Sequence, residues 1–165
     1  MDADLRPVRS DGLHVTLRFL GRVEPARESA IRAVAAGVAA STRPFPMSLE
    51  KMGTFPNGSR PRVLWLGVGQ GRREIGTLAD ALQADLSEEG WTPDPGPYRA
   101  HCTLARLPES LSPSSAKALA DFCAQDLRPL RAAVEFLALL ESLPVPRGPN
   151  RYPRRARWRL GEPLS

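Results

Sequence analysis

The spacing of apolar residues changes along the chain and predicts helices separated by strands. Apolar side chains recur every three or four residues over 72–89, the spacing of one helix face, and Gly90 ends that segment. A second helix is predicted over 24–41, with Pro25 in its first turn. A third begins at Ser112-Pro113, a capping residue followed by a first-turn proline, and runs to about 126. The apolar positions of the 72–89 helix are Ile75, Leu78, Leu82 and Leu86.

Short segments rich in apolar and β-branched residues, bounded by turn formers, predict strands between these helices. The segment 53–61, with its glycines and prolines, is predicted to be a loop. The resulting order, βαββαβαββ, divides the chain into two similar halves with no linker or low-complexity segment, and we expect a single domain over 1–165. The expected strands cover 13–20, 45–51, 62–68, 99–106, 131–141 and 152–160.

The two halves share a short motif. His14-Val15-Thr16-Leu17 stands in the first and His101-Cys102-Thr103-Leu104 in the second, and these are the only two histidines in the chain. On a strand, residues i and i+2 share a face, so each motif is expected to present an imidazole and a hydroxyl to one surface. Two such strands side by side would form a cleft floored by two histidines and two threonines.

This set of side chains suits phosphoryl chemistry without a metal ion. Histidine exchanges protons near neutral pH, so a pair can act as general base and general acid. Threonine hydroxyls can bind phosphate oxygens, and arginine can add charge through its fork of donors. Arg18 shares the face of His14 and Thr16 by alternation, whereas Arg106 reaches the cleft only if its strand ends or bulges first.

The paired motif resembles the signature of the two-histidine phosphoesterase superfamily, and within it the RNA 2′,3′-cyclic phosphodiesterases, also called 2′-5′ RNA ligases. The resemblance covers nearly the whole chain in order. It extends from the first motif block at 13–21 through a middle strand at 60–68 and the second block at 101–106 to the C-terminal segments 140–143 and 148–152.

The resemblance implies an α+β fold of two lobes, with antiparallel sheets flanking a central cleft and helices outside. It implies hydrolysis of an RNA 2′,3′-cyclic phosphate end to a 2′-phosphomonoester, and joining of ends in a 2′-5′ linkage when reversed. It assigns His14 as proton donor and His101 as proton acceptor, with Thr16 and Thr103 on the phosphate. The substrate-binding candidates are Arg106, Arg18 and Tyr98.

One departure from the family pattern concerns the beginning of the sequence. Family members begin with a strand and a helix before the lead-in to the first motif, which here is 5–12. About thirty residues would be absent at ordinary element lengths. We expect the loss of a strand to expose a sheet edge or open one lobe, without displacing either motif.

The charge and the cysteine content indicate which partners the protein is expected to have. The 23 basic residues, almost all arginine, outnumber the 18 acidic residues and give a net charge of +5. This charge fits a polyanion such as RNA but also the arginine enrichment of a GC-rich genome. The two cysteines form no framework, and Cys102 is expected as a buried thiol facing away from the cleft. We expect a cytoplasmic monomer that acts on RNA ends or cyclic-phosphate nucleotides, with no cofactor, membrane or obligatory protein partner.

Several residues leave alternatives open. Phe19 and Trp65 are expected in the core rather than as surfaces that stack on bases. The segment 151–159 interleaves arginine with Tyr152 and Trp158 and is either an RNA contact or an edge strand. The alternative functions are a phosphodiesterase of small cyclic nucleotides or ADP-ribose cyclic phosphate, and a nucleotide-binding module without turnover.

Overall fold

The computed structural model describes residues 5–58, 60–146 and 148–162, which form two antiparallel sheets and three α-helices. The helices are α1 (Glu28–Ser41), α2 (Arg72–Glu88) and α3 (Pro113–Cys123), and short 3₁₀ turns cover Ser10–Gly12 and Pro25–Arg27. The strands are β1 (Arg6–Pro7), β2 (Phe45–Phe55), β3 (Val63–Val68), β4 (His101–Arg106), β5 (Leu130–Val134), β6 (Phe136–Leu140) and β7 (Arg154–Arg159). The larger sheet has the order β1-β4-β3-β2-β5, and the smaller pairs β6 with β7.

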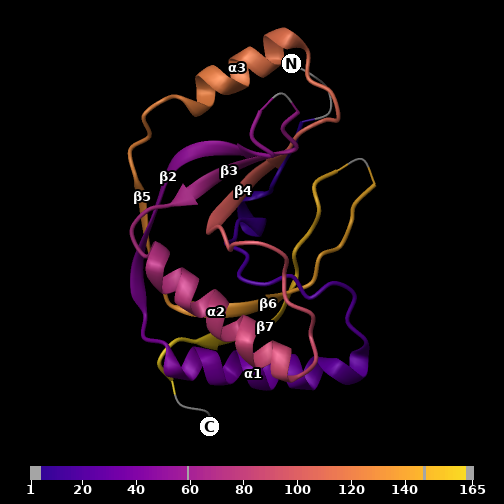
Figure 1. The fold of residues 1–165 in the computed structure, drawn as a ribbon, viewed down its shortest axis with the longest axis vertical. Coiled ribbons are helices and arrows are strands. Elements are labelled where there is room, and N and C mark those ends of the chain that lie inside the picture. Colours follow the sequence, from indigo (N-terminus) through magenta and orange to yellow (C-terminus); the bar gives the residue numbers. More distant parts are fainter. Residues whose placement is uncertain (1–4, 59, 147, 163–165) are drawn as a thin grey trace.

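The two sheets build two lobes, as Figure 1 shows, with α3 over the larger sheet and α1 and α2 beside the smaller one. The expected α+β class with antiparallel sheets and outer helices is therefore confirmed. The three predicted helices are present within a few residues of their expected bounds. No helix in the described part of the chain is both long and apolar enough to cross a membrane.

The main core lies between α1, α2 and the smaller sheet. The helical spacing predicted from sequence is the buried face of α2, because Leu78, Leu82 and Leu86 all pack in this core. They meet buried residues of α1 and, from the second sheet, Leu137 of β6. Burial of several such side chains, each contributing roughly 1.5–3 kcal/mol, holds this lobe together.

A smaller core lies between α3 and the larger sheet. Leu64 of β3, Ala105 of β4 and Leu107 are buried there, and Leu119 and Cys123 of α3 pack against them. The hydroxyl of Ser112 accepts a hydrogen bond from the Ser115 backbone N–H at 3.1 Å, which caps the first turn of α3 as predicted.

Two strand predictions and one loop prediction need correction. The expected strand over 13–20 is absent as a regular element, because within the described residues its only sheet-type pairing is an isolated bridge at Val15. The expected strand over 131–141 is two strands in different sheets, divided at Glu135, where the chain crosses from one lobe to the other. The predicted loop over 53–61 begins later, since β2 continues to Phe55 opposite Val63. Alternation along a sequence does not reveal which partners a segment will find.

Candidate active site

The first motif segment, His14–Leu17, lies beside β4, which carries the second motif. Val15 forms an antiparallel bridge with Cys102. At this register His14 stands opposite Thr103, and Thr16 stands opposite His101. Because neighbours on extended chains point to opposite sides, all four lie on the side away from Val15 and Cys102. The structure thus brings together the four side chains that the paired motif predicted as one set.

Both imidazoles are held in the same way by their own chain. The Nδ1 atom of His14 lies 2.7 Å from the carbonyl oxygen of Gly12, and that of His101 lies 2.7 Å from the carbonyl oxygen of Arg99. A carbonyl oxygen only accepts, so Nδ1 carries the proton in each bond. In the neutral ring this leaves Nε2 as the nitrogen with the free lone pair, and in the charged ring Nε2 holds a proton to give.

The two rings differ in what packs against them. The His101 ring meets Phe55 edge-on at 5.0 Å between centroids and lies 6.4 Å from Trp65. The His14 ring meets Tyr152 at 4.7 Å, also edge-on. Sequence reasoning missed Phe55 as a site residue. Phe55 reaches His101 because β2 pairs with β3 and β3 pairs with β4. These pairings join residues that are far apart in sequence, so no local pattern predicts the contact.

Trp65 is not the core residue expected from its apolar strand. Its neighbours Leu64 and Leu66 are buried, so alternation turns Trp65 to the opposite face, where it lies opposite Thr103. The indole ring extends over Gly53 of β2, where a Cβ atom would come within 2.3 Å of the ring. The absence of a side chain at Gly53 therefore lets Trp65 lie flat on the sheet beside His101.

Arg106 shares the face of His101 because β4 bulges. The register of β3 with β4 shifts between Leu64, which pairs with Ala105, and Trp65, which pairs with Thr103. The extra residue, Leu104, reverses the alternation that would otherwise turn Arg106 away. This is the bulge on which the prediction for Arg106 depended, and the exposed guanidinium is available to an anion on that face.

Arg18 does not follow the alternation predicted for it. The chain bends at Leu17, and the Arg18 guanidinium donates to the Thr92 carbonyl and forms an ion pair with Asp94 at 2.5 Å. Its side chain is only 5% exposed. The structure therefore places Arg18 against the loop that leads into β4 rather than beside His14, because a bent segment has no fixed alternation.

Tyr98 lies between the two motifs. Its hydroxyl donates a hydrogen bond of 2.9 Å to the Thr16 carbonyl oxygen. Burial of the hydroxyl raises the pKa of Tyr98 to about 12. The hydroxyl is thus engaged with the protein backbone, although sequence reasoning assigned it to the substrate.

Two further expectations are settled by burial. Cys102 is 3% exposed and faces away from His101 and Thr103, which confirms the predicted buried thiol, and burial raises its pKa. Phe19 is 69% exposed, so the expectation that it belongs to the core was wrong. The reason is the same bend that turns Arg18, since the residues after Leu17 no longer alternate between core and surface.

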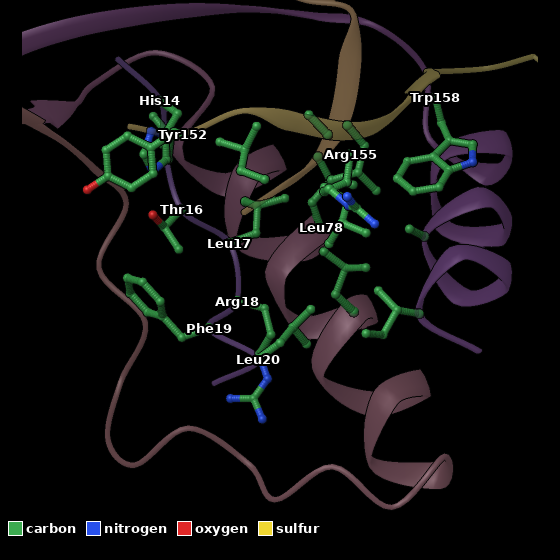
Figure 2. Close-up of a pocket in the computed structure, with 18 of the residues that line it drawn as sticks. His14, Thr16, Leu17, Arg18, Phe19, Leu20, Leu78, Tyr152, Arg155 and Trp158 are labelled. Carbon is green, nitrogen blue, oxygen red and sulfur yellow. The ribbon is translucent and has the colours of Figure 1, made fainter. Parts of the chain in front are cut away.

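A cavity of about 1060 Å³ lies behind the first motif segment. Figure 2 shows His14, Thr16 and Tyr152 at one end, Leu17 and Leu20 along it, and Arg18 pointing away. The segment that follows the first motif lines it on one side and apolar side chains of α1, α2 and β6 on another, and Arg155 and Trp158 belong to its far side. His101 and Thr103 do not line it, so it is not the cleft between the motifs.

Acid–base side chains of the described residues do not gather into a metal site. Within residues 5–58, 60–146 and 148–162, no group of three or more His, Cys, Asp or Glu side chains is arranged to hold an ion.

Comparison with known proteins places the chain in a family. The family model of the 2′-5′ RNA ligase superfamily matches residues 4–144. An RNA 2′,3′-cyclic phosphodiesterase of Archaeoglobus fulgidus is 30% identical over 88% of this chain and 78% of its own length. A solved structure from Thermus thermophilus superposes with a TM-score of 0.76 at 26% identity, covering 95% of this chain and 82% of that one. The chain belongs to the 2′-5′ RNA ligase superfamily.

The chain spans little more than half the length of some relatives. An RNA 2′,3′-cyclic phosphodiesterase of Aeropyrum pernix is 33% identical over 103 residues, which are 62% of this chain and 57% of that protein.

Proposed function

We propose that this protein hydrolyses RNA 2′,3′-cyclic phosphate ends to 2′-phosphomonoesters, with the two histidines as acid and base. The observation that carries the proposal is the common arrangement of His14 and His101, each with Nδ1 bonded to a backbone carbonyl, on adjacent antiparallel segments. The names of relatives such as the phosphodiesterases of Archaeoglobus fulgidus and Aeropyrum pernix support the choice of substrate.

The proposed reaction is one displacement at phosphorus. The neutral ring of His101 keeps a lone pair on Nε2, which takes a proton from water. The water oxygen bonds to phosphorus as the bond to the 3′ oxygen breaks, and charged His14 gives its Nε2 proton to that departing oxygen. The product carries a 2′-phosphate and a free 3′-hydroxyl, and each ring ends in the opposite charge state.

Thr16 and Thr103 are proposed to bind the non-bridging phosphate oxygens, where hydroxyl donors gain strength as negative charge grows. Arg106 adds a positive charge on the same face. With a 5′-hydroxyl in place of water, the same site would join two RNA ends through a 2′-5′ linkage. The assignment of His14 as donor and His101 as acceptor follows the family resemblance.

The test is hydrolysis of an oligoribonucleotide that ends in a 2′,3′-cyclic phosphate, in EDTA, by the wild type, His14→Ala and His101→Ala. We expect a 2′-phosphate product and a loss of about 10²–10⁴-fold in each variant, the usual contribution of general acid–base catalysis. Thr16→Val and Thr103→Val should also lose rate. Thr77→Val is the matched control, because Thr77 is an exposed threonine of α2.

Circular dichroism of each protein shows whether it is folded. A folded wild type without turnover, or a 3′-phosphate product, would overturn the proposal. So would histidine variants that keep the wild-type rate. A 2′,3′-cyclic mononucleotide assayed in parallel separates a preference for RNA from a preference for small cyclic nucleotides.

A further inference from the structure

The two motif segments have little backbone pairing to hold them together. In the described part of the chain, one isolated bridge, between Val15 and Cys102, joins them. By contrast, β4 pairs with β3 from His101 to Arg106. The pairing of β1 with β4 at Arg6 and Pro7 holds the chain several residues before the first motif. Past Val15 no further pairing of this kind holds the described chain on β4, so other contacts must set the position of Thr16 against His101.

The loop from α2 to β4 supplies such contacts at two points. The Tyr98 hydroxyl donates to the Thr16 carbonyl oxygen at 2.9 Å. Arg18 in turn donates through Nη2 to the Thr92 carbonyl, and its Nη1 lies 2.5 Å from Oδ1 of Asp94. We call these three side chains, Arg18, Asp94 and Tyr98, the motif clasp.

The clasp works in both directions. Tyr98 stands three residues before His101 and bonds the peptide of the first motif, whereas Arg18 stands two residues after Thr16 and bonds the loop that leads into the second motif. Tyr98, close to His101, therefore holds the first motif, and Arg18, close to Thr16, holds the loop that positions the second motif.

Burial strengthens the contacts of Arg18. The Arg18 side chain is almost fully buried, so water competes little for its guanidinium. Among the described residues its Nε and Nη1 atoms have no hydrogen-bond partner, and Asp94 compensates the charge as an ion pair at Nη1. A buried cation that lost Asp94 would be left uncompensated, which proteins tolerate poorly. The Tyr98 hydroxyl is protonated, and thus a donor, throughout the neutral range, because the ordinary tyrosine pKa of about 10 already lies above that range and desolvation raises it further.

We propose that the motif clasp positions His14 and Thr16 against His101 and Thr103, so that Arg18, Asp94 and Tyr98 are positioning residues rather than substrate ligands. The kinetic part of this inference rests on the proposed function. A displacement at phosphorus needs the acid and the base in line with the reacting atoms, and a misplacement of about 1 Å can cost about 10²-fold in rate. The clasp should therefore govern the chemical step and leave substrate affinity nearly unchanged.

The first test needs no turnover. Because the chain has only two histidines, an NMR spectrum with histidine labelled at ring Cε1 contains two ring signals, which His14→Ala and His101→Ala assign. Inorganic phosphate is the probe. We expect Tyr98→Phe and Arg18→Met to change the ring signals and their response to phosphate.

A matched control is available on the same loop. Arg27 donates from Nη2 to the Glu89 carbonyl at 2.7 Å and stacks on Trp91, but it touches neither motif. Arg27→Met therefore removes an arginine–carbonyl tie of the same kind. Its ring signals should match those of the wild type.

The second test is kinetic. Tyr98→Phe and Arg18→Met should lower kcat by about tenfold or more while KM stays within about twofold, since they remove alignment and not binding. Arg18→Lys, which keeps a cation for Asp94, should recover part of the loss. Arg27→Met should keep the wild-type kcat.

The outcomes separate the two proposals. A folded wild type without turnover overturns the proposed function, and the ring signals still test the clasp. An active wild type, with kcat and both ring signals unchanged in Tyr98→Phe, overturns the clasp. A rise in KM at constant kcat also overturns it, because it marks substrate ligands. If Arg18→Met does not fold, Tyr98→Phe, which loses only one oxygen, carries the test.

Discussion

The two motif segments contain the same residues in different settings. His101 lies in β4, a strand of a five-stranded sheet, with Phe55 and Trp65 against its ring. His14 lies in a segment that beyond Val15 forms no sheet pairing within the described residues, and its ring meets Tyr152. Yet both rings make the same 2.7 Å bond to the carbonyl two residues before.

This difference separates two properties of the site. The orientation of each ring is a local matter, because the bond that fixes it closes within three residues of chain. The distance between the rings is not local, since it depends on the Val15–Cys102 bridge, on the pairing of β1 with β4, and on contacts from a loop about eighty residues away in sequence. We expect perturbations of the sheet to affect His101 and perturbations of the loop to affect His14.

The largest expected effect comes from replacing the histidines of both motifs at once. If the two histidines act as one unit, the double variant His14→Ala/His101→Ala should lose about as much kcat as either single variant, roughly 10²–10⁴-fold. Single-turnover hydrolysis of a cyclic-phosphate oligonucleotide measures all three proteins. Losses that multiply would mean that the histidines contribute independently.

A perturbation confined to the His101 side is Gly53→Ala. The added Cβ would meet the Trp65 ring at 2.3 Å, so the indole must move, and we expect the free energy of unfolding to fall by about 1–3 kcal/mol. Urea denaturation measures this. In the control, Gly37→Ala, the new methyl meets nothing within 4 Å in α1, and stability should rise by about 0.5–1 kcal/mol. Equal stability of Gly53→Ala and wild type would show that Trp65 is not held by this contact.

The bridge between the motifs can be probed through the thiol behind it. Burial raises the pKa of both thiols, but Cys102 is only 3% exposed, whereas Cys123 is partly exposed on α3. We expect a thiol reagent near pH 8 to label Cys102 about tenfold or more slowly than Cys123, because only an accessible thiolate reacts. Cys123→Ser isolates the slower site. Rapid labelling of Cys102 would mean that the bridge opens readily.

The smallest expected effect is a titration on the His14 side. The pKa of Tyr98 is about 12, above the ordinary tyrosine value of about 10, so the folded protein holds this proton more tightly than the unfolded chain. Stability linked to Tyr98 is present below about pH 10 and is lost as the pH rises toward 12. The difference in tyrosinate absorbance between wild type and Tyr98→Phe isolates this step. Ionisation near pH 10 would place the hydroxyl in water.

Sequence predicted best the features that depend on neighbours along the chain. The spacing of Leu78, Leu82 and Leu86 gave α2 its buried face, and Ser112-Pro113 gave α3 its start. The repeated motif predicted which four side chains would share a face, because that follows from alternation over three residues.

The errors lie where distant segments decide the outcome. Alternation assigns Arg18 to phosphate, but a bend at Leu17 and the loop carrying Asp94 give it another partner. The apolar strand around Trp65 assigns it to the core, although its face is set by which neighbours pack beneath β3. Arg106 depends on a bulge that only the pairing of β3 with β4 reveals.

The bond from each imidazole to the carbonyl two residues earlier has a consequence for how such a site can arise. A tripeptide that sets the orientation of its own histidine ring needs no particular strand around it. The two copies here make the same Nδ1–carbonyl bond, one inside a sheet and one outside it. Such a unit can be copied within a gene, or grafted onto an unrelated scaffold, and retain its reactive nitrogen. What must then be built anew is only the spacing between two copies.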